Sequence, residues 1–329
     1  MSDTPDAGGD GSPTYYDLPT LKEPVWIWSV PAYFYVGGAA AGAALLGAVA
    51  QLADRQGHAT LIGRCRWVAT GGTVLSTALL IEDLGRPARF LNMLRVFRPT
   101  SAMSMGSWLL AANSTAAGAA AVLPRLGLRR LGDAAGLGSG ALAPALGTYT
   151  AVLISDTAVP VWQATRRSTP ALFAASGLVA ATSALDLLEH DERDEVLLHR
   201  LGTAAKVADL AASEVVEHAA DRLERVGRPL HEGASGAMWT AAKSCIAGSL
   251  VVSLVPVPER WRRWRRRLAA VLGTAGSIAT RFALFHAGTA STRDPRATFE
   301  QQRAGRGAAE VTGRADLLDA GRAGGDAGG

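Results

Sequence analysis

The sequence has few residues that can hold a redox cofactor. Only two cysteines occur in 329 residues, Cys65 and Cys245. An iron–sulphur cluster needs four thiolates or a close substitute, so this chain does not build one. The two thiols form either an isolated disulphide or, as we expect, two unpaired buried thiols. Any cluster that the protein uses has to come from another chain.

Histidine is also scarce, with six residues scattered along the chain. Haem ligation within a helix bundle needs two histidines at the same depth on facing helices. Only His218 and His286 lie away from the ends of apolar segments, and they make a poor pair, so we expect no haem. The chain lacks a phosphate-binding loop, a nucleophile elbow and zinc-ligand spacing as well. We therefore expect no catalytic residue, no metal site and no nucleic-acid partner.

Long apolar stretches are frequent, although the mean hydropathy is only +0.14. Polar ends lower this average, and much of the apolar sequence is Ala and Gly, which favour close helix packing in lipid. A bilayer crossing needs about 20 residues. Eight segments are long enough: 26–53, 59–81, 103–123, 137–161, 170–188, 201–220, 234–257 and 268–288. The last four carry charges. We predict an all-α integral membrane protein with a multi-pass domain over residues 25–290.

Polar ends flank this predicted membrane domain. Residues 1–24 are acidic and show no cleavable signal peptide, and residues 291–329 read as a disordered tail rich in Gly, Ala, Arg and Asp. The arginine-rich residues 259–267 are expected to lie against anionic headgroups. Among the connections between the eight segments, the first, third, fifth and seventh hold more Lys and Arg than the second, fourth and sixth. This puts both termini outside the cytoplasm, although the four arginines of residues 82–100 oppose that orientation.

The most charged stretch between two apolar segments is residues 82–100. It reads Asp-Leu-Gly-Arg-Pro at 83–87 and Met-Leu-Arg at 93–95, and Pro-Thr-Ser-Ala-Met-Ser-Met-Gly-Ser-Trp follows at 99–108. The Gly-Arg-Pro triplet ends any helix there. These motifs resemble those of the NrfD-like family of polysulphide reductase membrane subunits, with Ala102 where a proline is expected. The resemblance runs from about residue 26 to residue 295.

The resemblance implies eight transmembrane helices in the bacterial cytoplasmic membrane, arranged as a four-helix bundle plus a second four-helix set. It also implies a function. The chain would be the quinone-interacting membrane subunit of a respiratory oxidoreductase. Electrons would pass between menaquinone or ubiquinone and a four-cluster iron–sulphur subunit, and then a molybdopterin-type catalytic subunit. The motifs do not give the direction of electron flow.

The resemblance also implies which residues contact the quinone head, namely Tyr33 in the first segment and Tyr149 in the fourth. Relatives carry Asn and His in the first helix where this chain has Val30 and Tyr33. The alternative is that both tyrosines are interfacial belt residues, as Trp26, Trp28, Trp162, Trp261 and Trp264 are expected to be from their places near segment ends.

Asp83 and Arg86 directly follow the second segment. One interpretation makes them an ion pair that caps a helix end at the surface. The other makes them the rim of the quinone mouth, beside a surface that docks the iron–sulphur partner. The predicted docking residues are Arg86, Arg89, Arg95 and Arg98.

The sixth segment carries four ionisable residues on one face, Lys206, Asp209, Glu214 and Glu217. Each costs about 3 kcal/mol or more at membrane depth, so such groups face protein or water. With Asp156 and Arg281 they line a hydrated proton path or, alternatively, form structural ion pairs.

Two other functions remain open at this stage. A secondary transporter would use the sixth segment as its coupling site, but the paired broken helices typical of transporters are not evident. A purely structural membrane anchor is the second alternative.

Overall fold

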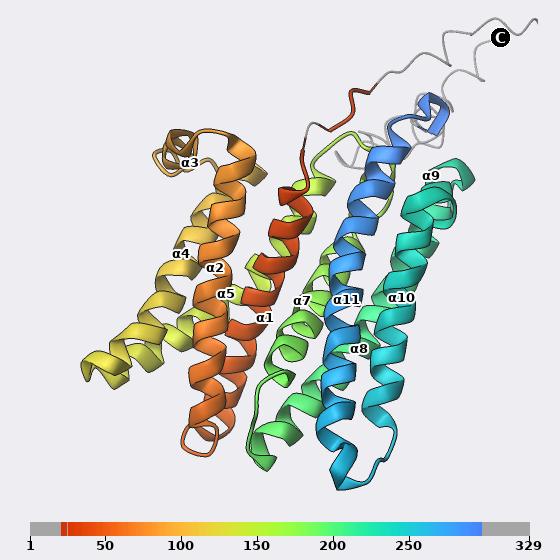
Figure 1. The fold of residues 1–329 in the computed structure, drawn as a ribbon. Helices are drawn as coiled ribbons and strands as arrows, with labels where there is room; N and C mark the ends of the chain where they lie inside the picture. Colours follow the sequence, from red (N-terminus) through yellow and green to blue (C-terminus); the bar gives the residue numbers. More distant parts are fainter. Residues whose placement is uncertain (1–20, 25, 298–329) are drawn as a thin grey trace, which may run out of the picture.

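The computed structural model describes residues 21–24 and 26–297, and in these residues it contains helices and no strand (Figure 1). Most of the predicted tails 1–24 and 291–329 lie outside the described residues. The eight long helices are α1 (Ser29–Asp54), α2 (Ala59–Leu84), α4 (Ala102–Val122), α5 (Arg129–Ser155), α7 (Thr169–Asp186), α8 (Glu192–Asp221), α10 (Gly233–Leu254) and α11 (Glu259–Ser291). The short elements are α3 (Pro87–Met93), η2 (Leu123–Leu126), α6 (Pro160–Ala164) and α9 (Glu224–His231).

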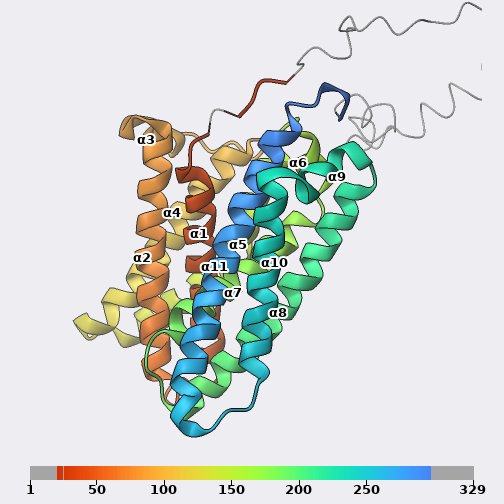
Figure 2. The ribbon, with the colours of Figure 1, turned by 45° about the vertical axis from the view of Figure 1, so that its right-hand side comes forward.

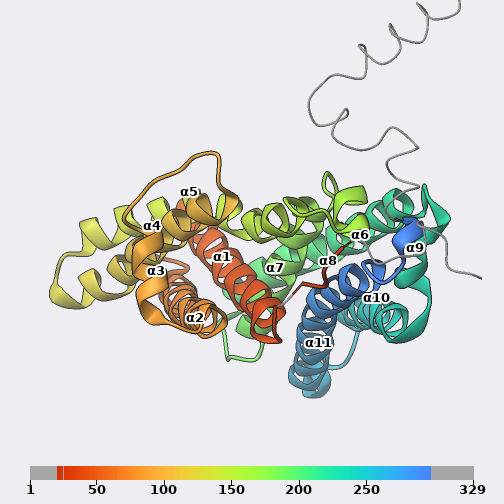
Figure 3. The ribbon, with the colours of Figure 1, turned by 90° about the horizontal axis from the view of Figure 1, so that it is seen from above.

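The long helices pack as two sets of four, seen side by side from above in Figure 3. In the first set, α1, α2, α4 and α5 contact one another in a ring, and α7, α8, α10 and α11 do the same in the second set. Contacts of α1 with α7 and α11, and of α5 with α7, join the sets. This is the arrangement that the resemblance implies.

The short helices α3, α6 and α9 all lie at one end of the molecule, which we call the upper end (Figures 1 and 2). The lower end carries the connections α1–α2, α4–α5, α7–α8 and α10–α11. Four of the described helices are long and apolar enough to cross a membrane: α1, α5, α10 and α11. A crossing by all eight stays a prediction.

Three helices differ in extent from the predicted segments. α5 ends at Ser155, and residues 160–164 form the separate helix α6, which starts after Val159, extended as residues before proline usually are. α8 starts nine residues before its apolar segment, and acidic residues in its first turn favour the helix N-terminus. α11 starts at Glu259, so the arginine-rich residues are its first turns, as the good helix propensity of arginine allows.

Glycines bring the two sets into backbone contact where α1 meets α7. A Cβ built on Gly42 would lie 2.5 Å from the carbonyl oxygen of Gly177. One built on Gly177 would lie 2.7 Å from the carbonyl oxygen of Gly38. No side chain fits between the helices at this level. We call this contact the α1–α7 seam.

The tryptophans expected in an interfacial belt do not all lie at the surface. Trp28, Trp261 and Trp264 are exposed, as belt residues are, but Trp162 is fully buried and its indole N–H donates to the Leu284 carbonyl at 2.9 Å. The expectation of a belt position for Trp162 is therefore wrong. Both cysteines are free thiols, and only Cys65 is fully buried.

Candidate functional site

The loop motif forms the upper connection between α2 and α4. Gly85 ends α2 in the left-handed conformation (φ 69°), and its N–H bonds to the Glu82 carbonyl. Arg86 is extended, and Pro87 opens α3 at its first position, where the missing N–H costs nothing. Each residue of the Gly-Arg-Pro triplet thus has a conformational role in the turn.

Two serines of the motif fix the start of α4. The Ser101 side chain caps the helix by accepting from the Ser104 N–H. The Ser104 hydroxyl donates to the Val96 carbonyl at 3.1 Å and accepts from the Arg98 N–H at 3.0 Å, which ties the preceding loop to the helix. Ala102 is the first residue of α4, a position that proline also favours, so the departure from the family pattern leaves the helix start intact.

A pocket lies beneath this connection, inside the first helix set, and we call it the tyrosine pocket. It brings together residues of α1, α2, α3, α4 and α5 and the chain before α1. Its lining consists of Trp26, Val30, Tyr33, Leu79, Leu80, Asp83, Leu84, Met93, Met103, Gly106, Ser107, Tyr149 and Leu153. Three of the four predicted quinone-site residues are among them.

The two tyrosines are buried inside the helix set, with 4% of Tyr33 and 9% of Tyr149 exposed. That burial removes them from the lipid surface where a belt residue would lie. Neither hydroxyl has a hydrogen-bond partner in the part of the chain that the structure describes. Tyr149 packs against α4 at Gly106, where any Cβ would overlap its ring carbon Cζ and its hydroxyl oxygen. The glycine of the motif therefore makes room for the tyrosine.

Asp83 and Arg86 occupy different places. Asp83 is half-buried, lines the tyrosine pocket and lies beside the backbone N–H of Ile27. Arg86 is exposed and does not line the pocket. No ion pair joins the two among the described residues, so the expectation of a capping pair finds no support.

The four predicted docking arginines are all exposed on α3 and the connection to α4. Only the Arg89 side chain has a hydrogen bond among the described residues, to the Leu84 carbonyl at 2.9 Å. The patch lies directly over the tyrosine pocket, because Met93 of α3 and Met103 of α4 belong to the lining. We call Arg86, Arg89, Arg95 and Arg98 the loop arginines.

The predicted proton-path residues form three groups along α8. The middle group is the most buried, with Arg281 and Asp209 each 1% exposed. The Arg281 guanidinium donates to the Phe173 carbonyl at 2.7 Å and lies 3.7 Å from the centre of the Phe173 ring. Asp209 faces Arg281 and lies beside Ser176. Arg281 Nε and Nη1 and Asp209 Oδ2 have no protein partner, which makes this a place for buried water.

The other two groups flank this pair. Toward the lower end, Lys206 donates to the Ser253 hydroxyl at 2.8 Å. Toward the upper end, Lys243 of α10 lies 2.5 Å from both Glu214 and Glu217. Glu214 is largely exposed. Asp156 is exposed at the end of α5, in the first helix set, and joins none of these groups.

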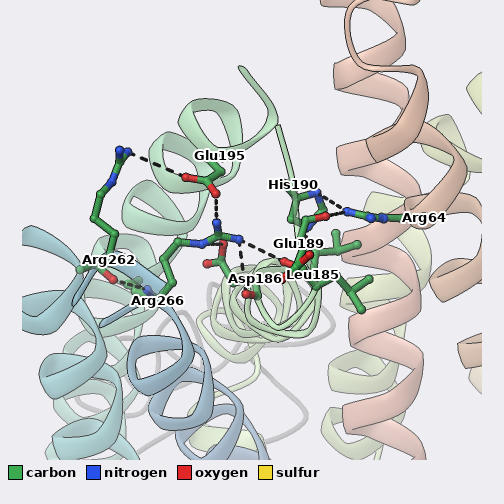
Figure 4. A network of polar contacts seen from close by, with 11 residues as sticks. Arg64, Leu185, Asp186, Glu189, His190, Glu195, Arg262 and Arg266 are labelled. Atoms are coloured by element: carbon green, nitrogen blue, oxygen red, sulfur yellow. Dashed lines mark hydrogen bonds and ion pairs between the residues drawn. The ribbon is translucent and has the colours of Figure 1, made fainter. Parts of the chain in front are cut away.

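A polar network holds the two sets together at the lower end (Figure 4). Arg64 of α2 donates to the Glu189 carbonyl and bonds to His190 Nδ1 at 3.0 Å. His190 Nε2 donates to the Leu185 carbonyl at 2.7 Å. This pattern needs a neutral imidazole with its proton on Nε2. Burial accordingly lowers the pKa of His190 from its usual 6.5.

The same network continues to α11. Arg266 pairs with Glu195 of α8 and lies 3.7 Å from the Asp186 carboxylate, and Arg262 lies 3.9 Å from Glu195. Part of the arginine-rich start of α11 is thus neutralised within the protein. The expected contact with anionic headgroups stays a prediction for the exposed arginines of this stretch.

Sequence reasoning missed several lining residues of the tyrosine pocket. Trp26 was expected in an aromatic belt, but it stacks on Trp162 with ring centres 5.7 Å apart and forms a pocket wall. Met93 and Met103 lie within the recognised motifs without having been singled out. Gly106 belongs to the Gly-Ser-Trp motif, and that motif was the available signal.

The comparison with known families agrees with the loop motif. Residues 18–122 match the family model described as polysulphide reductase, NrfD. Among curated proteins none matches the chain. The matched residues include α1, α2, α3 and α4, hence most of the tyrosine pocket and all four loop arginines. With the four helices that can cross a membrane, the match identifies an integral membrane protein. Over residues 18–122 the chain is similar to the polysulphide reductase NrfD family, which confirms the resemblance expected from residues 83–108.

Proposed function

We propose that the chain is the quinone-reactive membrane subunit of a respiratory oxidoreductase. One observation carries the proposal: Tyr33, Asp83 and Tyr149 meet in one pocket of the first helix set, and both tyrosine hydroxyls lack a partner there. Both hydroxyls are available in the pocket as donors, so a ligand that accepts hydrogen bonds can be held there.

The lining fits a quinone in chemical terms. Leucine, methionine and tryptophan side chains supply apolar walls for the ring and its isoprenoid tail, while the tyrosine hydroxyls donate to the carbonyl oxygens. Reduction of a quinone takes up two electrons and two protons, and we assign proton transfer between the pocket and the loop to the half-buried Asp83 carboxylate, which lines the pocket. The cavity is small, about 40 Å³, so ring entry requires side chains to move. Met93 and Met103 have the flexibility for this.

The loop arginines support a docking role. They form an exposed cationic patch directly over the tyrosine pocket, so an acidic partner bound there would bring a cluster close to the quinone. The partner class follows from the family, whose members generally associate with iron–sulphur and catalytic subunits. We propose a four-cluster iron–sulphur subunit and, beyond it, a molybdopterin-type catalytic subunit.

Eight membrane crossings in the bacterial cytoplasmic membrane, with both termini outside the cytoplasm, complete the proposal. The three polar groups along α8 then span the second helix set from its lower to its upper end. The unpartnered buried atoms of the middle group, Asp209 and Arg281, favour a hydrated proton path over a purely structural set of ion pairs.

A secondary transporter is less well supported. Its substrate site would lie where helices are broken at mid-membrane. In the described residues each of the eight long helices is continuous, including α5 with its internal Pro144.

The test compares tyrosine variants in the purified complex. Tyr33→Phe with Tyr149→Phe should lower quinol turnover about tenfold or more, at about 1 kcal/mol for each lost hydrogen bond. Thr148→Val is the control, because Thr148 precedes Tyr149 on α5, donates only to carbonyls of its own helix and does not line the pocket. Turnover and inhibitor binding unchanged in the double variant would contradict a quinone site between α1 and α5.

A further inference from the structure

One wall of the tyrosine pocket is anchored outside the first helix set. Trp26, in the chain before α1, lines the pocket together with Tyr33 and Tyr149. Its indole stacks on that of Trp162, with ring centres 5.7 Å apart and planes inclined by 20°. It also stacks on the ring of Phe285, at 6.5 Å and 26°. The wall therefore packs against aromatic side chains of α6 and α11, and we call Trp26, Trp162 and Phe285 the aromatic stack.

The two supporting rings lie on the same side of the Trp26 indole. Rings stacked on its opposite faces would have their centres about 7 Å or more apart, which is twice the contact distance of carbon atoms. The ring centres of Trp162 and Phe285 are only 6.1 Å apart. The indole of Trp26 is half-buried, and the pocket meets the part of it that these two rings leave free.

Trp162 is fixed in its place by α11. Its side chain is fully buried, and its indole N–H donates to the Leu284 carbonyl at 2.9 Å. Gly288 makes room for the ring, because a Cβ at that position would overlap the Trp162 indole. The backbone N–H of Val161 donates to the Ser291 hydroxyl at 3.5 Å. The support of the pocket wall is thus part of the second helix set.

We propose that the Trp26 indole is the platform on which the quinone ring stacks, and that Trp162 is a positioning residue that holds this platform in place. The inference rests on the proposed quinone function of the tyrosine pocket. An electron-rich indole attracts the electron-poor face of a quinone ring, whereas the tyrosine hydroxyls bind only the carbonyl oxygens at its edge. Contacts at the edge and on the face together fix the orientation of a flat ring.

The rest of the lining does not offer such a surface. The ring of Tyr149 packs against Gly106 of α4, and the Tyr33 ring lies 5.7 Å from that of Phe34. The other walls are mainly aliphatic or methionine side chains. Met93 and Met103 are flexible enough to move aside when a ring enters. The quinone ring would therefore lie between a flexible methionine wall and a fixed aromatic one.

The experiment measures quinone binding to the full-length chain in detergent by quenching of tryptophan fluorescence. The probe is menaquinone with two isoprene units. Trp26→Leu removes the platform but keeps an apolar side chain, and it should weaken probe binding about two- to tenfold, the range that one aromatic pair contributes. It should also remove part of the quenching at saturation. Trp28→Leu is the matched control, because Trp28 is 60% exposed and does not line the pocket.

The possible results separate the platform from the proposed quinone function. If Trp26→Leu binds the probe as tightly as Trp28→Leu does, the platform is refuted while the quinone site stands. A wild-type chain that does not bind the probe would contradict the quinone function and the platform together.

Steady-state kinetics of the assembled complex add an independent readout. Trp26→Leu should raise the KM for menaquinol and leave kcat nearly unchanged, because a platform binds the ring equally in the ground state and the transition state. A lower kcat at an unchanged KM would assign Trp26 a structural role only and would overturn the proposal.

Variants of Trp162 test the positioning role. Trp162→Leu removes the support and should weaken probe binding about as much as Trp26→Leu does. Trp162→Phe keeps a ring for stacking and loses only the hydrogen bond to the Leu284 carbonyl, so it should recover most of the affinity. In a Trp26→Leu background, Trp162→Leu should have little further effect on binding, because the two residues act as one unit. Equal losses in Trp162→Leu and Trp162→Phe, or fully additive losses in the double variant, would overturn the positioning role.

Discussion

The contact between Gly106 and Tyr149 offers a sharp test of the tyrosine pocket. A Cβ at position 106 would overlap the ring, and all three nearest atoms to it belong to Tyr149. Gly106→Ala therefore either strains the packing of α4 against α5 or pushes Tyr149 out of the pocket. Overpacking of this kind costs about 1–3 kcal/mol. We expect the variant to be less stable by that amount, or to lose quinol turnover because the Tyr149 hydroxyl has left the pocket.

The matched control lies on the same helix. A Cβ at Gly118 meets no atom within 4 Å, so Gly118→Ala should leave turnover unchanged and stabilise α4 by up to about 1 kcal/mol. Stability is measured by thermal unfolding in one detergent, and turnover in the assembled complex.

A double-mutant cycle identifies the clash partner. In a Tyr149→Ala background the space around Gly106 is free, so Gly106→Ala should then cost almost nothing. The coupling free energy should equal nearly the whole single-variant effect. If Gly106→Ala behaves like Gly118→Ala in stability and turnover, or if its cost persists without the Tyr149 ring, the packing described for the tyrosine pocket is refuted.

Three further predictions concern other parts of the chain. Arg281→Gln removes the positive charge that faces the buried Asp209 and the hydrogen bond to the Phe173 carbonyl, and should destabilise the protein by about 1–3 kcal/mol, with partial recovery when Asp209→Asn is added; thermal unfolding of the three proteins checks this. Burial lowers the pKa of His190 in the folded protein, so the neutral ring stabilises the fold at pH values above the unfolded pKa near 6.5. This stabilisation is lost as pH falls through the lower pKa of the folded protein. Unfolding scans between about pH 5 and 8 should show a stability that rises with pH, and His190→Gln should reduce this rise. Arg89→Glu with Arg95→Glu should release the electron-transfer partner in pull-downs from mild detergent while the chain still inserts, and recovery of the partner at wild-type yield would move docking elsewhere.

Each of the eight apolar segments overlaps one long helix. Hydropathy was sufficient for the first four, whereas the last four carry charges and were counted with the help of the family resemblance. The ends were less predictable. Residues 129–136 are Arg- and Gly-rich and still helical, since η2 and the packing against α4 hold the start of α5. The short helices α3, α6 and α9 follow prolines or loops and have too few residues to give a periodic pattern.

The tyrosine pocket was predictable only through the motif. Alanine and glycine cover every face of α1 and α5, so the sequence does not indicate which side meets a neighbour. Tyr33 and Tyr149 were found by resemblance, whereas Trp26 needed the stacking on Trp162 to be recognised as a wall. The spacing of the charged residues along α8 shows that they share one face of the helix. Which groups they form depends on their partners on α10 and α11, and the sequence of α8 does not indicate those partners.

The α1–α7 seam has a mechanical consequence. Where backbones touch without side chains between them, sliding α1 along α7 would bring Gly42 against the bulkier Ala181 of α7. The close contact therefore resists sliding of the two helix sets against each other at this level. Such a seam holds the tyrosine pocket of the first set next to the charged groups of α8 in the second, so that a change at one site can act on the other through electrons, protons and electric fields.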